Sequence, residues 1–451
     1  MSIEIVTFGC RLNSYESELI RKFASNARLT SVIIINSCAV TGEAERQLRQ
    51  TIRCIKKEKP EARIVVTGCA AQINPEVYAN MPEVSVVIGN IEKLEQETYN
   101  KLLELRNVAN TGTYDENKIK SEITPQSVPI ARCAVMVSDI MSVKNTALHM
   151  VDGFEGKVRG FIQVQNGCNH RCTFCIVPYS RGNSRSVPFG EIVEQTRLLV
   201  EKGYKELVLT GVDIAEYGMD LPGKPSLGQV VKRLLKLAPD LPRIRLSSID
   251  VAEIDNHLLD LIANEPRFMP HLHLSLQSGD DLILKRMKRR HSCTQALEFC
   301  YKVRQLRPNI ALGADIIAGF PTETDDMFLN TYNLINEGGI VYLHVFPYSE
   351  RANTLAAKMQ QVPKVIRKHR AAILRELGAK MLNLHQSKQI GKVLKVLIEN
   401  EWVGRAEDYS TVKFGECIDS QKSNIGRLID CFIMGTASAK DGGYLIGNGF
   451  K

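Results

Sequence analysis

Several features are missing from this 451-residue sequence. It has no apolar run approaching the roughly 20 residues that a membrane-spanning helix needs, so we expect no membrane partner. Its first ten residues lack the basic segment and long apolar stretch of a secretory signal peptide. No charge of one sign dominates, because the net charge is +8 and the isoelectric point is about 8.8. This mild basic bias is compatible with an acidic partner such as RNA. We therefore expect a cytoplasmic globular protein.

The chain also lacks the character of a disulfide scaffold. It is long and lysine-rich, and 44% of its residues are hydrophobic, so a sizeable core can form without crosslinks. Its twelve cysteines are better explained as metal ligands plus ordinary buried thiols of a reducing compartment. The length itself suggests about three domains.

Short apolar strands alternate with helices in the first part of the chain. The pattern predicts strands at 3–8, 31–36, 62–67 and 84–88, with helices at 15–27 and 43–59. Strands separated by helices form a parallel sheet. We predict a Rossmann-like domain over residues 1–104, and a polar, less periodic linker over 105–150.

The alternation resumes at residue 161 and continues for longer. The pattern predicts strands at 161–165, 206–210, 243–247, 271–277, 311–317 and 341–346, and helices that include 189–202, 227–237, 293–306, 325–336 and 364–384. Six βα units in series form a partial, TIM-like (βα)6 barrel, which we assign to residues 151–384. Residues 385–451 consist of short strands between turn residues and predict a small all-β barrel. The predicted fold class is α/β.

Three cysteines follow the first barrel strand in the run N-G-C-N-H-R-C-T-F-C, which contains Cys168, Cys172 and Cys175. Active-site loops of such barrels lie at the carboxyl ends of the strands. Iron–sulfur clusters take cysteine thiolates, and a cubane with three local ligands keeps one iron for a cofactor. The alternative is a tetrahedral zinc site with His170 or a distant residue as the fourth ligand. The spacing favours the iron–sulfur cluster.

Small or polar residues also stand near the ends of other predicted barrel strands. Gly211, Gln277 and Asp315 occur in the runs L-T-G-V-D, S-L-Q-S-G and G-A-D-I-I. Each could be an ordinary strand-to-loop turn, but together they suit a small polar ligand across the barrel mouth.

A second set of cysteines follows strands of the first domain. Cys10, Cys38 and Cys69 each stand one or two residues after a predicted strand. Parallel strands end at the same edge of a sheet, so these distant cysteines could meet there and form a second metal centre. The alternative is three buried cysteines that pack as small hydrophobic residues.

The cysteine loop, with Phe174 before its last cysteine and I-V-P-Y-S-R-G after it, resembles the radical S-adenosylmethionine superfamily. The resemblance implies that Cys168, Cys172 and Cys175 hold a [4Fe–4S] cluster, whose open iron chelates S-adenosylmethionine and cleaves it to a 5′-deoxyadenosyl radical. It also implies that Phe174, Gly211, Gln277 and Asp315 line the cofactor.

The runs T-F-G-C-R-L-N-S-Y-E-S-E, N-S-C-A-V-T-G-E and V-V-T-G-C-A-A-Q resemble a subgroup of that superfamily, the methylthiotransferases. The resemblance implies an auxiliary [4Fe–4S] cluster on Cys10, Cys38 and Cys69, and an RNA-binding TRAM domain at the C-terminus. It further implies that the radical abstracts hydrogen from C2 of a modified adenine, that sulfur held at the auxiliary cluster joins this carbon, and that a second S-adenosylmethionine donates the methyl group. The expected electron donor is a flavodoxin or ferredoxin, and the sequence does not identify the sulfur donor.

Within this group, F-G-C-R-L-N is similar to the branch that acts on N6-threonylcarbamoyladenosine at position 37 of tRNA. The near alternatives are N6-isopentenyladenosine in tRNA or a ribosomal protein as substrate. The distant alternative is a non-catalytic, zinc-containing tRNA-binding protein. Two residues depart from the family pattern, Ser37 in place of a usual Thr and Asn353 in place of a usual Gly. Asn tolerates a left-handed backbone, so the second turn is expected to survive.

Basic residues gather on two late segments. Residues 281–308 carry eight Lys or Arg against two acids, and residues 364–380 carry six against one. Phosphate contacts supply most of the sequence-independent affinity for RNA. The expected RNA contacts are Lys285, Arg286, Arg289, Arg290, Arg367, Lys368 and Arg370. For 364–380, a solvated helix face is an equal alternative.

The remaining cysteines are expected to be structural and buried. They are Cys54, Cys133, Cys293, Cys300, Cys417 and Cys431.

Overall fold

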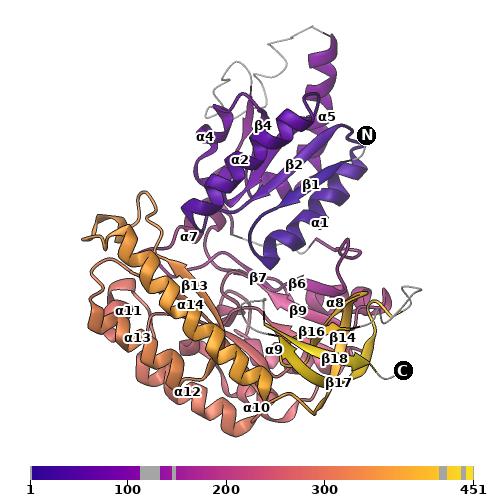
Figure 1. The fold of residues 1–451 in the computed structure, drawn as a ribbon. Coiled ribbons are helices and arrows are strands. Elements are labelled where there is room, and N and C mark those ends of the chain that lie inside the picture. The colour runs from indigo at the N-terminus through magenta and orange to yellow at the C-terminus, as the bar shows by residue number, and fades with distance from the viewer. Residues whose placement is uncertain (1–2, 112–132, 145–148, 416–423, 438–442, 450–451) are drawn as a thin grey trace. The chain divides into compact units, whose positions relative to one another are not determined.

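The computed structural model describes residues 3–111, 133–144, 149–415, 424–437 and 443–449, and the chain divides into two compact units. The N-terminal unit comprises Met1–Val151, Asn166–His170 and Cys175–Asn183. The core unit comprises Asp152–Gln165, Arg171–Phe174 and Ser184–Lys451 (Figure 1). The segment 166–183 therefore contributes to both units. No helix of the described residues is long and apolar enough to cross a membrane.

The N-terminal unit is built on a parallel sheet with strands in the order β1-β2-β3-β4-β5. The strands are β1 (Glu4–Thr7), β2 (Val32–Ser37), β3 (Arg63–Gly68), β4 (Val84–Ile88) and β5 (Ala134–Met136), and the helices are α1 (Arg11–Asn26), α2 (Gly42–Glu58), α3 (Cys69–Ile73), α4 (Pro75–Ala79), α5 (Gln96–Thr111) and α7 (Val177–Arg181). The expected strands and helices of this region are all present, with small shifts of their ends.

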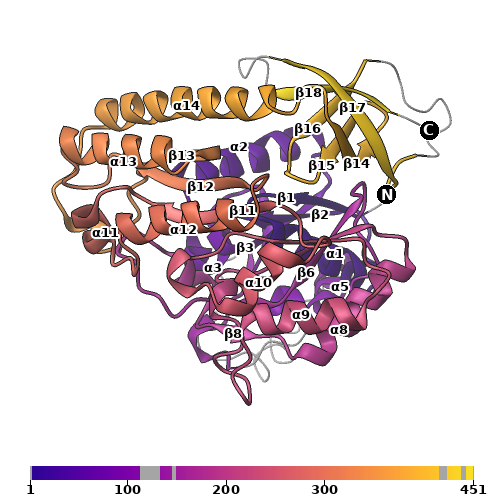
Figure 2. The same ribbon diagram turned by 90° about the horizontal axis from the view of Figure 1, so that it is seen from below.

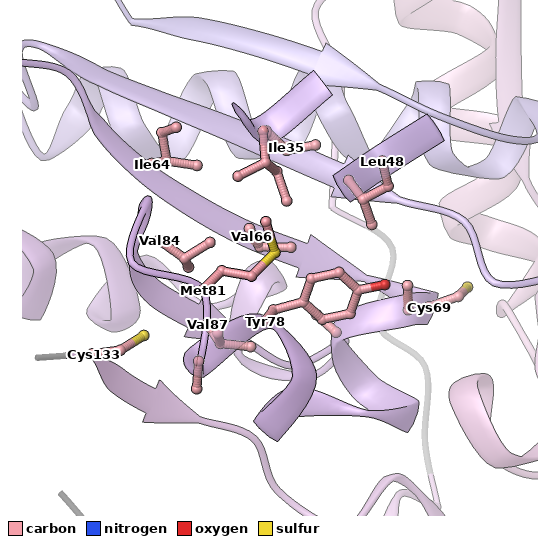
Figure 3. Packing of buried hydrophobic residues seen from close by; sticks show 14 of the residues in the cluster. Ile35, Leu48, Ile64, Val66, Cys69, Tyr78, Met81, Val84, Val87 and Cys133 are labelled. Carbon is pink, nitrogen blue, oxygen red and sulfur yellow. The ribbon is translucent and has the colours of Figure 1, made fainter. Parts of the chain in front are cut away.

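Helices cover both faces of this sheet, which explains why its strands are continuous apolar runs. Successive side chains of a strand point to opposite faces. Ile33 and Ile35 therefore pack with residues of α2 and α4, whereas Ile34 packs with residues of α1 and α5. Figure 3 shows the first of these clusters, in which Tyr78 and Met81 lie against the strand side chains.

The fifth strand lies within the range that we predicted as a linker. β5 pairs with β4 through Ile88 and Met136, so the sheet extends beyond residue 104. A strand of three residues is too short to produce a recognisable alternation in the sequence, and β5 owes its position to pairing with a neighbour.

The core unit contains the six expected parallel strands. They form two three-stranded sheets, β10-β9-β6 and β11-β12-β13, with isolated bridges from Ile244 to Phe268 and from Ile249 to Leu274 between them. The strands are β6 (Arg159–Gln163), β9 (Glu206–Thr210), β10 (Arg243–Leu246), β11 (His271–Gln277), β12 (Ala311–Ala318) and β13 (Ile340–Pro347), and the short strands β7 (Gln165–Asn166) and β8 (Arg185–Ser186) lie between β6 and β9 in sequence.

Helices connect these strands (Figure 2). They are α8 (Phe189–Glu201), α9 (Leu227–Leu237), α10 (Asn256–Asn264), α11 (Asp281–Met287), α12 (Cys293–Leu306), α13 (Asp325–Glu337) and α14 (Lys364–Ser387). The order of strands and helices confirms the partial barrel that the sequence predicts.

The chain ends in a closed five-stranded barrel with the order β14-β15-β16-β18-β17. Its strands are β14 (Val393–Asn400), β15 (Val403–Ala406), β16 (Thr411–Phe414), β17 (Leu428–Ala437) and β18 (Tyr444–Gly449). Figure 2 shows α14 leading into this barrel. The predicted small β domain is therefore confirmed, with β15 as one additional strand.

The small barrel is fixed to residues near the amino ends of the core strands. Arg245 donates to the carbonyls of Ala406 and Glu407 at 2.9 and 2.8 Å, and its Nε lies 2.8 Å from Glu206 Oε1. From the small barrel, the ring of Tyr409 stacks on His271 of β11 with centroids 4.5 Å apart. These contacts close the amino ends of β9, β10 and β11, and leave the carboxyl ends for the site.

Candidate functional site

The second cysteine set lies where the sequence predicts, at the carboxyl edge of the N-terminal sheet. Cys38 and Cys69 directly follow β2 and β3, and Cys10 follows β1 after a short loop. A Cβ at Gly9 would lie 3.1 Å from the Cys38 sulfur, so the loop before Cys10 runs directly against Cys38. Gly9 has φ +96°, a conformation that other residues rarely adopt.

The electrostatics of Cys38 also reflect its two neighbours. Burial raises the pKa of the Cys38 thiol to about 11, and the charges of Cys69 and Cys10 act in the same direction. Thiolates that disfavour one another need a cationic centre to become ligands. Cys10 is exposed and Cys69 is buried, so the set runs from the core to the surface.

Three polar side chains hold this edge together. Asn13 Nδ2 donates to the carbonyls of Phe8 at 2.6 Å and Ser37 at 3.0 Å, and so ties the Cys10 loop to the end of β2. Arg181 Nη2 donates to Asn13 Oδ1 at 2.5 Å, and Arg181 Nη1 donates to Glu16 Oε1 at 2.7 Å. Sequence reasoning missed this network, because Arg181 is 168 positions from Asn13 and no local motif links the two.

The family departure at Ser37 has a structural role. Its hydroxyl accepts hydrogen bonds from the backbone N–H groups of Ala70 at 3.2 Å and Ala71 at 3.4 Å, directly after Cys69. The end of β2 thereby holds the first turn of α3. Asn353, the other departure, has φ +68°, as expected for a residue that replaces Gly.

The first cysteine set belongs to the segment that contributes to both units. Cys168 and Cys175 lie in the N-terminal unit, and Cys172 lies in the core unit. The Cys168 N–H donates to the carbonyl of Gly182 at 3.1 Å. The preceding Gly167 has φ +74°, and a Cβ there would lie 1.9 Å from the Asn183 carbonyl oxygen, so only glycine fits. The ligand role of the three cysteines stays a prediction.

In the core unit, a buried arginine contacts Cys172. Arg289 Nη1 lies 3.7 Å from the Cys172 sulfur, and Arg289 Nη2 donates to Asp250 Oδ2 and to the Ser275 carbonyl, both at 2.7 Å. The neighbouring Phe174 packs in an apolar cluster, with its ring centroid 6.4 Å from that of Phe320. The guanidinium therefore provides a positive charge beside one proposed cluster ligand.

The other predicted cofactor residues also belong to the core unit. Gly211 follows β9, where Gln165 Oε1 accepts from the backbone N–H groups of Val212 at 3.0 Å and Asp213 at 2.8 Å. Gln277 ends β11 with φ +69°. Asp315 lies within β12. Their cofactor contacts stay predictions.

The structure corrects part of the predicted RNA surface. Arg367 and Arg370 are each 5% exposed. Arg367 donates to the carbonyls of Val362 and Tyr348, and Arg370 donates to Glu323 Oε1 at 2.9 Å. The Arg289 side chain is 8% exposed. These arginines are buried and donate to groups inside the protein, which contradicts the sequence-based prediction that they contact phosphates.

The other predicted RNA residues differ in their availability. Lys285, Arg290 and Lys368 are exposed, and Arg290 pairs with Glu253. Arg286 is half-buried and donates to Thr322 Oγ1 at 2.8 Å.

Among the cysteines expected to be structural, Cys133, Cys300 and Cys431 are buried, as predicted. Cys54 is exposed, because the buried face of α2 is formed by Leu48 and Ile52. Cys293 is half-buried at the start of α12. Cys417 lies outside the described residues.

Two protein-family models match this chain, one in the N-terminal unit and one mainly in the core unit. Residues 162–335 match the family model of the radical SAM superfamily, and residues 2–89 match the model described as uncharacterized protein family UPF0004. A solved structure of the radical S-adenosylmethionine methyltransferase TsrM from Kitasatospora setae aligns with a TM-score of 0.54 at 13% identity, covering 79% of this chain and 77% of that one. This likeness concerns the fold alone. Fold and domain match together define a radical SAM protein.

Curated relatives narrow the assignment. Threonylcarbamoyladenosine tRNA methylthiotransferase MtaB of Rickettsia prowazekii is 55% identical over 91% of this chain and 90% of its own length. MtaB of Aquifex aeolicus is 38% identical over 92% of this chain and 96% of its own length. A tRNA-2-methylthio-N(6)-dimethylallyladenosine synthase of Orientia tsutsugamushi is 32% identical over 96% of both. The chain belongs to the MtaB family of radical SAM methylthiotransferases.

Proposed function

We propose that this chain is a tRNA methylthiotransferase that adds a methylthio group to C2 of N6-threonylcarbamoyladenosine at position 37 of tRNA. The observation that carries the proposal is the 55% identity to the Rickettsia MtaB over 91% of the chain. The relatives act on tRNA by name, so tRNA is the proposed partner, together with a flavodoxin- or ferredoxin-type electron donor and a sulfur donor. The proposed location is the cytoplasm.

The residues present suit two iron–sulfur clusters. Cys168, Cys172 and Cys175 would hold the radical-generating [4Fe–4S] cluster, and Cys10, Cys38 and Cys69 would hold the auxiliary one. When bound, the clusters and S-adenosylmethionine supply the radical, the sulfur and the methyl group.

The protein's own residues position and charge-balance the two sets. In the N-terminal unit, Asn13 holds the Cys10 loop against β2, and Arg181 lowers the electrostatic cost of the nearby thiolates Cys69 and Cys10. In the core unit, Arg289 does the same for Cys172. Hydrogen bonds and charges near the sulfurs are the means by which a protein sets the potential of a cluster.

The nearest competing function is the same chemistry on N6-isopentenyladenosine, since a dimethylallyladenosine synthase is 32% identical. Nucleoside analysis of tRNA from a strain that lacks this gene separates the two. The proposal expects loss of 2-methylthio-N6-threonylcarbamoyladenosine and accumulation of its unmethylthiolated precursor. Unchanged levels of that nucleoside would overturn the proposed substrate.

Cluster content separates an enzyme from a zinc-containing tRNA-binding protein. Anaerobic reconstitution with iron and sulfide should yield two [4Fe–4S] clusters per chain. The triple alanine variants of Cys168, Cys172 and Cys175, and of Cys10, Cys38 and Cys69, should each retain one. Bound zinc without iron–sulfide absorption would contradict the proposal.

A further inference from the structure

A histidine–aspartate–histidine cluster lies on three neighbouring strands of the core unit. His273 of β11, Asp315 of β12 and His344 of β13 each offer one ligand atom, and these atoms all lie within 4.8 Å of one another. His273 Nε2 is 3.0 Å from Asp315 Oδ1, and His344 Nδ1 is 3.2 Å from the same oxygen. Neither histidine belongs to a cysteine motif, and the proposed function assigns no role to either.

The cluster lies on the face of the sheet opposite to that of Leu343, which packs against α14. A Cβ at Gly378 of α14 would lie 3.0 Å from Leu343 Cβ, so Leu343 points toward that helix. Adjacent residues of a strand point to opposite faces, so His344 points away from it. Tyr342 shares the face of His344 and contacts the ring of Tyr409 at 6.0 Å. His344 is two residues closer to the carboxyl end of β13 than Tyr342, so the cluster lies on the carboxyl-end side of the contact with the small barrel.

A glycine makes this convergence possible. Gly313 of β12 is the register partner of His273. A Cβ at Gly313 would lie 2.5 Å from His273 Nδ1, so the imidazole occupies the space that a side chain would fill. The ring thereby leans over β12, with its centroid 4.6 Å from that of His344.

The donor geometry suits a single ion, although His344 Nδ1 also forms a hydrogen bond with Asp315 Oδ1. His273 Nε2 is buried and makes no aligned hydrogen bond to a described residue, although Asp315 Oδ1 is 3.0 Å away. Ligands about 2.0 Å from a tetrahedral ion lie about 3.3 Å from one another, close to the two observed separations. The Asp315 carboxylate pairs with the two histidines, and the cluster keeps a formal negative charge when both imidazoles are neutral.

We propose that His273, Asp315 and His344 bind one divalent transition-metal ion of the zinc type. Two imidazoles and one carboxylate are a common ligand set of a catalytic zinc site, which keeps a further position for water or substrate. The side chain of His344 is 61% exposed, so an ion can reach the site from solvent. The free position would take an oxygen ligand, and the carboxylate of a threonylcarbamoyl group is one. That last step rests on the proposed function, whereas metal binding does not.

Metal binding is tested on the full chain with all six cluster cysteines changed to alanine, so that iron–sulfur clusters cannot form. This chain should bind one equivalent of Co2+ with the visible absorption of a tetrahedral or five-coordinate ion. Asp315→Asn and His344→Gln should each weaken Co2+ binding by more than the ~10–100-fold that loss of an outer-shell partner causes. His257→Gln, which changes an exposed histidine elsewhere in the core unit, should leave binding unchanged.

Thermal unfolding distinguishes loss of a metal ligand from loss of the fold, if a variant is less stable than the parent chain. Co2+ should raise the melting temperature of the six-alanine chain and of His257→Gln, but not of Asp315→Asn, because only a ligand that binds the folded state stabilises it. Absence of a bound equivalent in the six-alanine chain, or unchanged binding in Asp315→Asn and His344→Gln, would overturn the metal site. A nucleoside probe tests its ligand: N6-threonylcarbamoyladenosine should change the Co2+ spectrum and adenosine should not. If the Co2+ spectrum were the same with both nucleosides, the carboxylate contact would be overturned. The metal site and the proposed methylthiotransferase activity would be unaffected by that result.

Discussion

The guanidinium of Arg181 donates two parallel hydrogen bonds to the carboxylate of Glu16, at 2.7 and 3.0 Å, and both side chains are almost completely buried. Lys93 approaches the same carboxylate at 2.7 Å. The negative charge of Glu16 is thus paired with two positive charges, those of Arg181 and Lys93, near the edge that carries the three cysteines. The excess positive charge suits thiolates at that edge, and Arg181 is in electrostatic contact with Cys69 and Cys10.

Replacing Glu16 by Gln should destabilise the N-terminal unit strongly. Two buried cations then lack their acid, and breaking such a pair costs about 3–5 kcal/mol. Urea unfolding of the cluster-free chain measures this. The matched control is Glu43→Gln, which breaks an exposed pair with Arg46 on the surface of α2 and should change the stability very little, because solvent screens this pair. Equal effects of the two changes would contradict the structural role of the buried group.

The same residue predicts a pH dependence. Burial alone would raise the pKa of Glu16, but the charges of Arg181 and Lys93 prevail and lower it to about 2, from an ordinary value of 4.5. A carboxyl whose pKa is lower in the folded state stabilises the fold above its unfolded pKa. This stabilisation is lost as the pH falls from about 4.5 toward 2. The difference in unfolding free energy between the wild-type chain and Glu16→Gln should therefore shrink over that range, and a constant difference would disprove the assignment.

Arg289→Gln should make the radical-generating cluster harder to reduce. The change removes a positive charge 3.7 Å from the Cys172 sulfur, and lower positive charge near a cluster lowers its potential. Redox titration followed by electron paramagnetic resonance measures the midpoint, in the variant that lacks the auxiliary cysteines. Arg290→Gln changes the exposed neighbour and should leave the midpoint in place. A midpoint unchanged by Arg289→Gln would argue against this influence.

Exposed and buried basic residues should behave differently toward tRNA. Lys285→Ala and Lys368→Ala should each weaken binding and reduce the slope of affinity against salt by about 1. Arg370→Ala should instead lower stability, because it removes the basic partner of the buried Glu323 carboxyl group. Filter binding at several salt concentrations, together with thermal unfolding, distinguishes the two effects. Loss of affinity without loss of stability in Arg370→Ala would show that our correction of the RNA surface is mistaken.

The sequence predicts long elements well, because periodicity and strand order decide them. β4, β9 and β11, and helices α9 and α12, have the predicted ends. The edge position of Cys10, Cys38 and Cys69 follows from the rule that parallel strands end together. Burial within a helix is harder to predict, since a basic residue looks the same whether it faces solvent or a partner. Arg367 and Arg370 therefore appeared available for RNA, while the acceptors that they bind come from distant segments.

Pairing between distant residues could not be predicted from the sequence either, because the partners come from segments that no local pattern connects. β5 and β15 exist because a neighbouring strand offers hydrogen bonds, not because of their own patterns. Arg181 and Glu16 are separated by 165 positions, and no local spacing links them. Asp315 could be selected near a strand end, but its two histidine neighbours depend on strand register and on the missing side chain of Gly313.

The most direct measurement uses reconstituted enzyme, S-adenosylmethionine and a reductant with two purified tRNAs. One tRNA carries N6-threonylcarbamoyladenosine at position 37 and the other carries N6-isopentenyladenosine. Mass spectrometry of the digested nucleosides should detect a methylthio group on the first only, and no product with the Cys10→Ala, Cys38→Ala, Cys69→Ala triple variant. Methylthiolation of the isopentenyl nucleoside alone, or of neither, would contradict the account.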